Sequence, residues 1–134
     1  MTFKNMLKKI LIADDDPGIV DAVEMMLNFY GYDVSSTYDG RDALKLSGEE
    51  LPDLFLLDIW MSGVDGRDIC RQLKGNEHTR NIPVLMISAS NDIDASARHA
   101  GADDFMTKPF DMQQLIDKIE NLLDAQQSPA VSLA

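Results

Sequence analysis

Polar side chains that could perform chemistry follow four of the short apolar runs in this sequence. Asp14 and Asp15 come directly after the first run, and Asp58 ends the third. Ser88 follows the fourth run, and Lys108 follows the fifth. Apolar runs that stop at polar residues are typical of strands buried on both faces of a parallel sheet. Because ligands bind at the carboxyl ends of such strands, we expect these side chains to converge on one small cleft.

Three carboxylates in one cleft predict a bound cation. Asp14, Asp15 and Asp58 would repel one another at close range unless they took up protons or were neutralised by a positive ion. An all-oxygen ligand set suits Mg²⁺, which prefers octahedral geometry and keeps several waters. A histidine-based metal site is not supported, because His78 and His99 fall in segments whose faces should be solvated. We therefore expect Mg²⁺ as the cofactor.

A lysine and a hydroxyl beside these carboxylates suit phosphoryl transfer. That reaction depends mostly on positioning and on neutralising charge on the transferring oxygens. Lys108 and Ser88 could contact those oxygens, while a carboxylate could act as nucleophile and form an acyl phosphate. Such a product is high in energy and hydrolysable, and this suits a switch.

A repeated pattern of strand and helix would position these residues. Strands are expected at Ile10–Ala13, Asp33–Thr37, Leu54–Leu57, Val84–Ile87 and Asp104–Thr107. Helices are expected at Pro17–Tyr30, from the cap Asp39 to Gly48, around Ile69–Leu73, from the cap Asp92 to Ala100, and from Asp111 to about Ala125. Five such units predict an α/β fold, a flavodoxin-like three-layer (βα)5 sandwich whose parallel five-stranded sheet has the order 2-1-3-4-5.

Length and composition favour a single domain. The chain has 134 residues and one cysteine, Cys70, and it is long enough to bury a core without disulfides. Cys70 lies in an apolar helical stretch, where a small buried side chain is expected. We expect the domain to cover residues 8–125 and a flexible tail to cover residues 126–134.

The charge of the chain limits its partners. Twenty-three acidic residues against 12 basic ones give a net charge of −11, which would repel a phosphate backbone, so no direct contact with nucleic acid is expected. No apolar run approaches the roughly 18 residues that span a bilayer. Residues 1–10 also lack the apolar core of a signal peptide. We therefore expect a cytoplasmic protein without membrane contact.

Four segments resemble the receiver domain of two-component response regulators. They read ILIADDDP at residues 10–17, PDLFLLD at 52–58, IPVLMISA at 82–89 and AGADDFMTKPF at 100–110. Each segment is weak on its own, but all four occur in the family's order and lie at the ends of expected strands. The resemblance covers about residues 8–125.

The resemblance implies a role for each polar residue of the cleft. Asp58 would accept a phosphoryl group from the phosphohistidine of a sensor histidine kinase or a histidine phosphotransfer protein. Asp14, Asp15 and Asp58 would hold Mg²⁺, together with the backbone carbonyl of Trp60. Lys108 would pair with the phosphoryl oxygens. Such a protein is a signalling phosphoacceptor that promotes only its own phosphorylation and dephosphorylation, and is not otherwise an enzyme.

The resemblance also implies a switch. Ser88 would supply the hydroxyl that turns toward the phosphate, and Phe105 would be the aromatic residue whose rotamer follows it. These steps would move the fourth helix and change a surface for a possible downstream protein. Two residues depart from the family's pattern, because Ser62 replaces a common proline and Phe105 replaces a frequent tyrosine. The family also implies a cis bond between Lys108 and Pro109.

Two other functions share some of these features. A phosphatase of the haloacid dehalogenase type also uses Mg²⁺ and an aspartate nucleophile, but it needs two aspartates separated by one residue, where this chain has the adjacent run Asp14–Asp16. A flavodoxin would have to hold a phosphate in the loop that carries these carboxylates, which would repel it. The sequence leaves open whether the chain is a stand-alone regulator, a phosphorelay intermediate or part of a larger protein.

Overall fold

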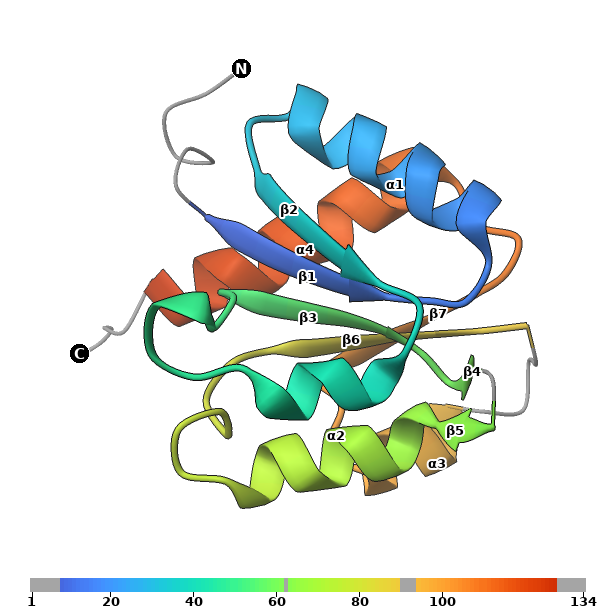
Figure 1. Cartoon of the computed structure of the whole chain (residues 1–134). Coiled ribbons are helices and arrows are strands. Elements are labelled where there is room, and N and C mark those ends of the chain that lie inside the picture. The colour runs from blue at the N-terminus through green and yellow to red at the C-terminus, as the bar shows by residue number, and fades with distance from the viewer. Residues whose placement is uncertain (1–7, 62, 90–93, 128–134) are drawn as a thin grey trace.

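A five-stranded parallel sheet forms the middle layer of the molecule (Figure 1). The structure is a computed structural model that describes residues 8–61, 63–89 and 94–127. The strands are β1 Lys9–Ala13, β2 Asp33–Thr37, β3 Leu54–Asp58, β6 Val84–Ser88 and β7 Asp104–Thr107. Their order in the sheet is β2-β1-β3-β6-β7. When the five strands of this sheet are numbered in chain order, β6 is the fourth and β7 the fifth. This confirms the predicted flavodoxin-like order 2-1-3-4-5.

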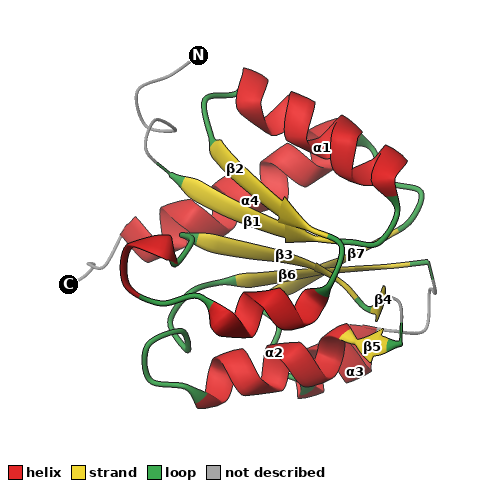
Figure 2. Cartoon of the chain, viewed as in Figure 1, coloured by secondary structure: helices red, strands yellow, loops and turns green. Residues whose placement is uncertain are grey.

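Helices cover both faces of the sheet, as Figure 2 shows. They are α1 Pro17–Phe29, the 3₁₀ helices η2 Gly40–Lys45 and η3 Gly48–Glu50, α2 Gly66–Gly75, α3 Asp94–His99 and α4 Met112–Gln127. One core cluster joins α1 and α4 to the sheet, and a second joins η2, α2 and α3 to its other face. None of the helices that the structure describes is long and apolar enough to cross a membrane.

Strand β1 illustrates why both faces of the sheet are apolar. Ile10 and Ile12 belong to the cluster beneath α1 and α4, whereas Leu11 and Ala13 belong to the cluster on the opposite face. Successive side chains of a strand point to opposite faces, so a strand covered on both sides needs a continuous apolar run. Such a run must stop where the strand leaves the core, and the next residue, Asp14, starts the polar edge.

Helix α1 begins at the predicted residue, Pro17, and ends at Phe29, one residue before the predicted end. The Asp16 carboxylate accepts hydrogen bonds from the backbone N–H groups of Gly18 at 2.9 Å and Ile19 at 3.4 Å, so this residue is the N-cap. Pro17 occupies the first helical position, where a missing N–H costs nothing. Gly31, at φ 95°, adopts the left-handed conformation that follows the helix.

The structure differs from the sequence-based expectations at two helices. Asp39 caps a short helix as predicted, but this is the 3₁₀ helix η2, which ends at Lys45 instead of reaching Gly48. Gly40 and Ala43 are its only buried residues and offer little apolar surface for a longer helix. At the other end, α4 continues through Gln127, so the expected tail does not begin at residue 126. The predicted cap Asp92 and the loop residue Ser62 lie outside the described residues.

Candidate functional site

Two buried carboxylates meet at the carboxyl edge of the sheet. Strands β1 and β3 pair with Ala13 opposite Leu57, so the residues that follow them, Asp14 and Asp58, lie side by side. They are 2% and 6% exposed, respectively. Asp15 is exposed, and one carboxylate oxygen from each of the three aspartates lies within 4.8 Å of the others. The structure therefore brings the three predicted metal ligands together.

Lys108 reaches this cluster from the loop after β7. Its ammonium nitrogen lies 3.0 Å from Asp14 Oδ2 and 3.3 Å from Asp58 Oδ2. The backbone N–H of Lys108 donates a 2.7 Å hydrogen bond to the carbonyl of Ser88 at the end of β6. The Lys108–Pro109 peptide bond is cis, as the family resemblance implied.

The environment of the cluster shifts the pKa values of Asp58 and Lys108. Burial, followed by the charge of Asp14, raises the pKa of Asp58 to about 6, although Lys108 acts to lower it. Burial acts to lower the pKa of Lys108, but its contacts with Asp14 and the charge of Asp58 outweigh burial and raise it. Asp58 is therefore an anion at neutral pH, at a cost in folding free energy.

The donor set fits a hard divalent cation. Three carboxylates face one ammonium group, so the cluster carries an excess of negative charge when its members are ionised. Asp14 Oδ2 is buried and lies 3.0 Å from the Lys108 ammonium, which is also 3.3 Å from Asp58 Oδ2. One ammonium group shared between two buried carboxylates leaves negative charge uncompensated, and an uncompensated buried charge is costly. Mg²⁺ prefers such carboxylate oxygens.

The loop after Asp58 packs tightly against the strand that carries this residue. The segments β4, Trp60–Met61, and β5, Val64–Asp65, form a small antiparallel pair. Gly66 then donates a 2.6 Å hydrogen bond from its N–H to the carbonyl of Ile59. A Cβ atom on Gly66 would overlap the Asp58 carbonyl oxygen, so this position has no room for a side chain. The sequence pattern did not predict this close approach.

Comparisons with known proteins agree with this arrangement. Residues 10–120 match the sequence profile of the response regulator receiver domain. The chain belongs to this family. A relative described as the DNA-binding dual master transcriptional regulator RpaA, from Synechocystis sp. (strain ATCC 27184 / PCC 6803 / Kazusa), is 40% identical over 119 residues, which cover 87% of this chain and 49% of that protein. The chain thus spans about half the length of this relative.

Two solved structures show the same likeness to this receiver domain. A response regulator from Chloroflexus aurantiacus J-10-fl superposes with a TM-score of 0.82 at 30% identity, covering 87% of this chain and 98% of that one. The response regulator protein TrrA from Thermotoga maritima, solved in complex with Mg²⁺-BeF, gives a TM-score of 0.77 at 28% identity and covers 87% and 99% of the two chains. Receiver domains bind Mg²⁺ in an acidic pocket, and the aspartate cluster is consistent with this.

The receiver domain places its remaining predicted site residues around the cluster. Ser88 is fully buried at the end of β6, one residue beyond the partner of Asp58 in the sheet. Phe105 is partly buried on β7, with the guanidinium carbon of Arg98 5.2 Å from the centroid of its ring. The side chain of Trp60 is 56% exposed. The predicted site residues other than Phe105 are therefore at, or next to, the carboxyl edge of the sheet.

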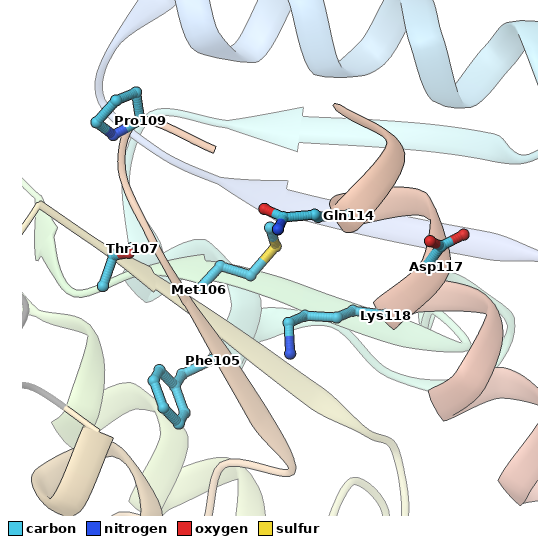
Figure 3. Close-up of a pocket in the computed structure, with 7 residues that line it drawn as sticks. All are labelled: Phe105, Met106, Thr107, Pro109, Gln114, Asp117 and Lys118. Carbon is cyan, nitrogen blue, oxygen red and sulfur yellow. The ribbon is translucent and has the colours of Figure 1, made fainter. Parts of the chain in front are cut away.

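A hollow of about 420 Å³ lies between β7 and α4 of the receiver domain (Figure 3), and none of the three clustered carboxylates lines it. Its lining comes from β7, the segment after it, and α4, and it comprises Phe105, Met106, Thr107, Pro109, Gln114, Asp117 and Lys118. Figure 3 shows Phe105 at one side of the hollow, with Lys118 between it and Asp117. The hollow is thus a surface next to Phe105 that is separate from the carboxylate cluster.

His78, His99 and Cys70, which were expected to play no chemical role, all lie in positions that agree with this expectation. His78 is 78% exposed and His99 is exposed, so both lie on solvated faces as predicted. Cys70 is buried in the core beneath α2. Burial raises the pKa of its thiol to about 11, which leaves it inert as a nucleophile at neutral pH.

Proposed function

We propose that Asp58 accepts a phosphoryl group from a phosphohistidine in a reaction that requires Mg²⁺. The observation that carries the proposal is the Lys108 ammonium, which contacts the buried Asp14 and Asp58 carboxylates at one edge of the sheet. A carboxylate raised in pKa by burial is ionised at neutral pH but poorly stabilised by its surroundings. Those features suit a nucleophile that is phosphorylated and then released by hydrolysis.

The step proceeds by nucleophilic attack. A carboxylate oxygen of Asp58 forms a bond to phosphorus, the bond between phosphorus and the histidine nitrogen breaks, and its electron pair stays on the imidazole. The product is an acyl phosphate on Asp58. Lys108 lies where its charge would offset that on the phosphoryl oxygens.

Asp14, Asp15, Asp58 and the backbone carbonyl of Trp60 would hold Mg²⁺, which would supply further neutralisation of the phosphoryl oxygens. Asp14 and Asp58 are buried and held by the strands before them, whereas Asp15 is exposed to solvent. A site with two fixed carboxylates and one open side leaves room for the waters that Mg²⁺ retains.

Phosphorylation would change the surface around β7. Ser88 would turn its hydroxyl toward the phosphoryl group, and the Phe105 ring would follow it. Because Phe105 lines the hollow between β7 and α4, a new ring rotamer would reshape a surface for a downstream protein. Receiver domains interact with histidine kinases, so a sensor histidine kinase or a histidine phosphotransfer protein is the proposed donor.

The proposed domain covers residues 8–125 and acts as a signalling phosphoacceptor, without turnover of an external substrate. Direct contact with nucleic acid forms no part of the proposal, because the net charge of −11 opposes it. The Synechocystis relative is described as DNA-binding, and that name belongs to a protein of which this chain covers 49%.

Mass spectrometry of the intact protein tests the proposal. Incubation with acetyl phosphate and Mg²⁺ should add one phosphoryl mass to the wild type, and neither Asp58→Asn nor an EDTA-treated sample should gain it. Asp16→Asn is the matched control, because asparagine can also cap α1 and this acid lies in the same run. Normal labelling of Asp58→Asn would rule out the assigned acceptor.

A further inference from the structure

Arg67, near the start of α2, holds three residues at once. Its Nε and Nη2 donate hydrogen bonds of 2.9 and 2.7 Å to the two carboxylate oxygens of Asp65. Its guanidinium carbon lies 4.8 Å from the centroid of the Trp60 ring. Its Nη1 donates a 3.1 Å hydrogen bond to the hydroxyl of Ser96. All three guanidinium nitrogens are therefore engaged, and the side chain is only 21% exposed.

The three partners belong to segments on either side of the carboxylate cluster. Trp60 and Asp65 face each other in the β4 and β5 pair, which follows Asp58 directly. Ser96 lies in α3, which follows Ser88 and β6 in the chain. Figure 1 shows α3 close to β5 and the start of α2. Arg67 thus joins the loop after Asp58 to the helix after Ser88.

Few apolar side chains hold α3 to the core in the part of this helix whose side chains the structure describes, residues 96–99. Among its described side chains and the residue after the helix, the buried ones are Ala97 and Ala100, which offer single methyl groups to the core. Arg98 adds a contact with the Phe105 ring. By contrast, α2 buries Ile69 and Leu73. Since apolar burial scales with area, polar contacts have a larger share in positioning α3 than in positioning α2.

We propose that Arg67 is a positioning residue that couples the loop after Asp58 to α3. The inference rests on the proposed function, in which the Trp60 carbonyl helps to hold Mg²⁺. The planar guanidinium of Arg67 has few alternative positions, because it is held by a bidentate ion pair with Asp65 and by the Trp60 ring. A displacement of Trp60 therefore moves the guanidinium group and, through its hydrogen bond, Ser96. Coupling of this kind is reciprocal, so a change at Ser96 also alters the affinity for Mg²⁺.

A purely structural role for Arg67 predicts different behaviour. If Arg67 only stabilised the β4 and β5 pair, removal of the Ser96 hydroxyl would leave Mg²⁺ binding unchanged. If Arg67 acted only through its charge, its removal would strengthen the binding of a cation. A positional role predicts weaker binding in both variants. Ser96→Ala changes no charge and removes one atom from a partly exposed site, so it should fold.

Calorimetric titration with Mg²⁺ alone and hydrogen exchange of the α3 amides, both on the full chain, test the coupling. Arg67→Ala, Arg67→Lys and Ser96→Ala should each weaken Mg²⁺ binding about fivefold, the low end of typical coupling, and should speed exchange in α3. The Arg67→Ala and Ser96→Ala double variant should bind no more weakly than Arg67→Ala. Arg71→Ala is the control, because Arg71 lies one turn further along α2 in an exposed ion pair with Asp68.

Each outcome decides the inference. Wild-type affinity in Ser96→Ala, or effects of Arg67→Ala that match those of Arg71→Ala, would overturn the coupling and leave the proposed function standing. A wild type that binds no Mg²⁺ would overturn the proposed function and the coupling with it. Weaker binding and faster α3 exchange in the Arg67 and Ser96 variants alone would establish the coupling.

Discussion

At the scale of single residues, Asp58 lowers the stability of the fold at neutral pH. Its pKa rises from the ordinary 3.8 to about 6 on folding, so between these values the folded protein binds more protons than the unfolded chain. Stability therefore falls as pH rises through this window and stays low above it. The carboxylate is retained at a position where a neutral side chain would give a more stable protein.

Asp58→Asn should therefore stabilise the metal-free protein. The gain should be about 1–3 kcal/mol at pH 8, because an amide has no charge to desolvate, and it should shrink as pH falls from 6 to 4. Urea unfolding of both proteins at pH 4, 5, 6 and 8 in EDTA measures this difference. A difference in unfolding free energy between the two proteins that does not vary with pH would contradict the raised pKa of Asp58 as its cause.

Lys108 and Mg²⁺ should compensate for each other at the same carboxylates. Lys108→Ala leaves Asp14 and Asp58 without their ammonium partner, so the metal-free variant should lose about 2 kcal/mol or more of stability at pH 8. Mg²⁺ should then raise its melting temperature more than that of the wild type, because the lysine no longer repels the cation.

Thermal unfolding with and without Mg²⁺ measures both effects. Lys118→Ala is the control, since Lys118 pairs with Asp104 at 3.0 Å, away from the carboxylate cluster. A smaller Mg²⁺ shift in Lys108→Ala than in the wild type would mean that Lys108 helps to organise the metal site instead of competing with the metal.

At the scale of elements, the contact between α2 and β3 sets the position of Asp58. The Gly66 backbone lies so close to the Asp58 carbonyl that a Cβ atom would overlap it. Gly66→Ala should therefore destabilise the protein by about 2 kcal/mol or more and reduce phosphorylation by acetyl phosphate, because the Asp58 backbone must shift. Gly75→Ala, at the other end of α2, should be neutral or slightly stabilising, since nothing lies within 4 Å of its Cβ position.

Urea unfolding and the phosphorylation rate of both glycine variants check this prediction. Equal stability of Gly66→Ala and Gly75→Ala would show that the loop yields at little cost. A loss of stability in Gly66→Ala without any loss of phosphorylation would separate packing from the placement of Asp58.

The sequence was informative about elements whose signal is local. The runs before Asp14 and Asp58 predicted their strands, and strand order placed both residues at one edge, where the structure brings them together. The helix expected from Asp39 to Gly48 is present with its predicted cap, but it is a shorter 3₁₀ helix, because a short segment with little apolar surface takes its conformation from its neighbours. The close approach of Gly66 to the Asp58 carbonyl could not be predicted from the spacing of apolar residues, because it depends on how α2 packs against β3.

The contacts of Arg67 could not be predicted from the sequence for a different reason. The sequence predicts a helix only around Ile69–Leu73, and the hydrogen bond from Arg67 to Ser96 joins residues 29 positions apart. Local propensity carries no information about such pairs, because they arise only when the sheet has brought α2 and α3 together. The contacts of Arg67 with Trp60, Asp65 and Ser96 are therefore seen only in the structure.

At the scale of the whole molecule, one sheet connects two separate apolar clusters. The cluster beneath α1 and α4 includes Ile10 and Leu56, and the cluster on the other face includes their neighbours Leu11 and Phe55. Adjacent residues of the same strand therefore serve both cores. Loss of the helices from either face would expose and destabilise strands that also form the core on the other face. The two helix layers should therefore unfold together, with the α3 amides the least protected from hydrogen exchange.

Cys70 allows this cooperativity to be measured. It is the one cysteine of the chain, it is buried beneath α2, and its pKa is raised to about 11 by burial, so a thiol reagent should reach it only when the α2 layer opens. Labelling at pH 8 should give an opening free energy equal to that of global unfolding in urea, and the urea-unfolded protein should react at once. A clearly smaller opening free energy would mean that α2 leaves the sheet while α1 and α4 remain folded. In that case the face that carries α2 and α3 would be a separately mobile unit, and changes at Asp58 could reach a partner by loosening the whole face instead of repositioning α3.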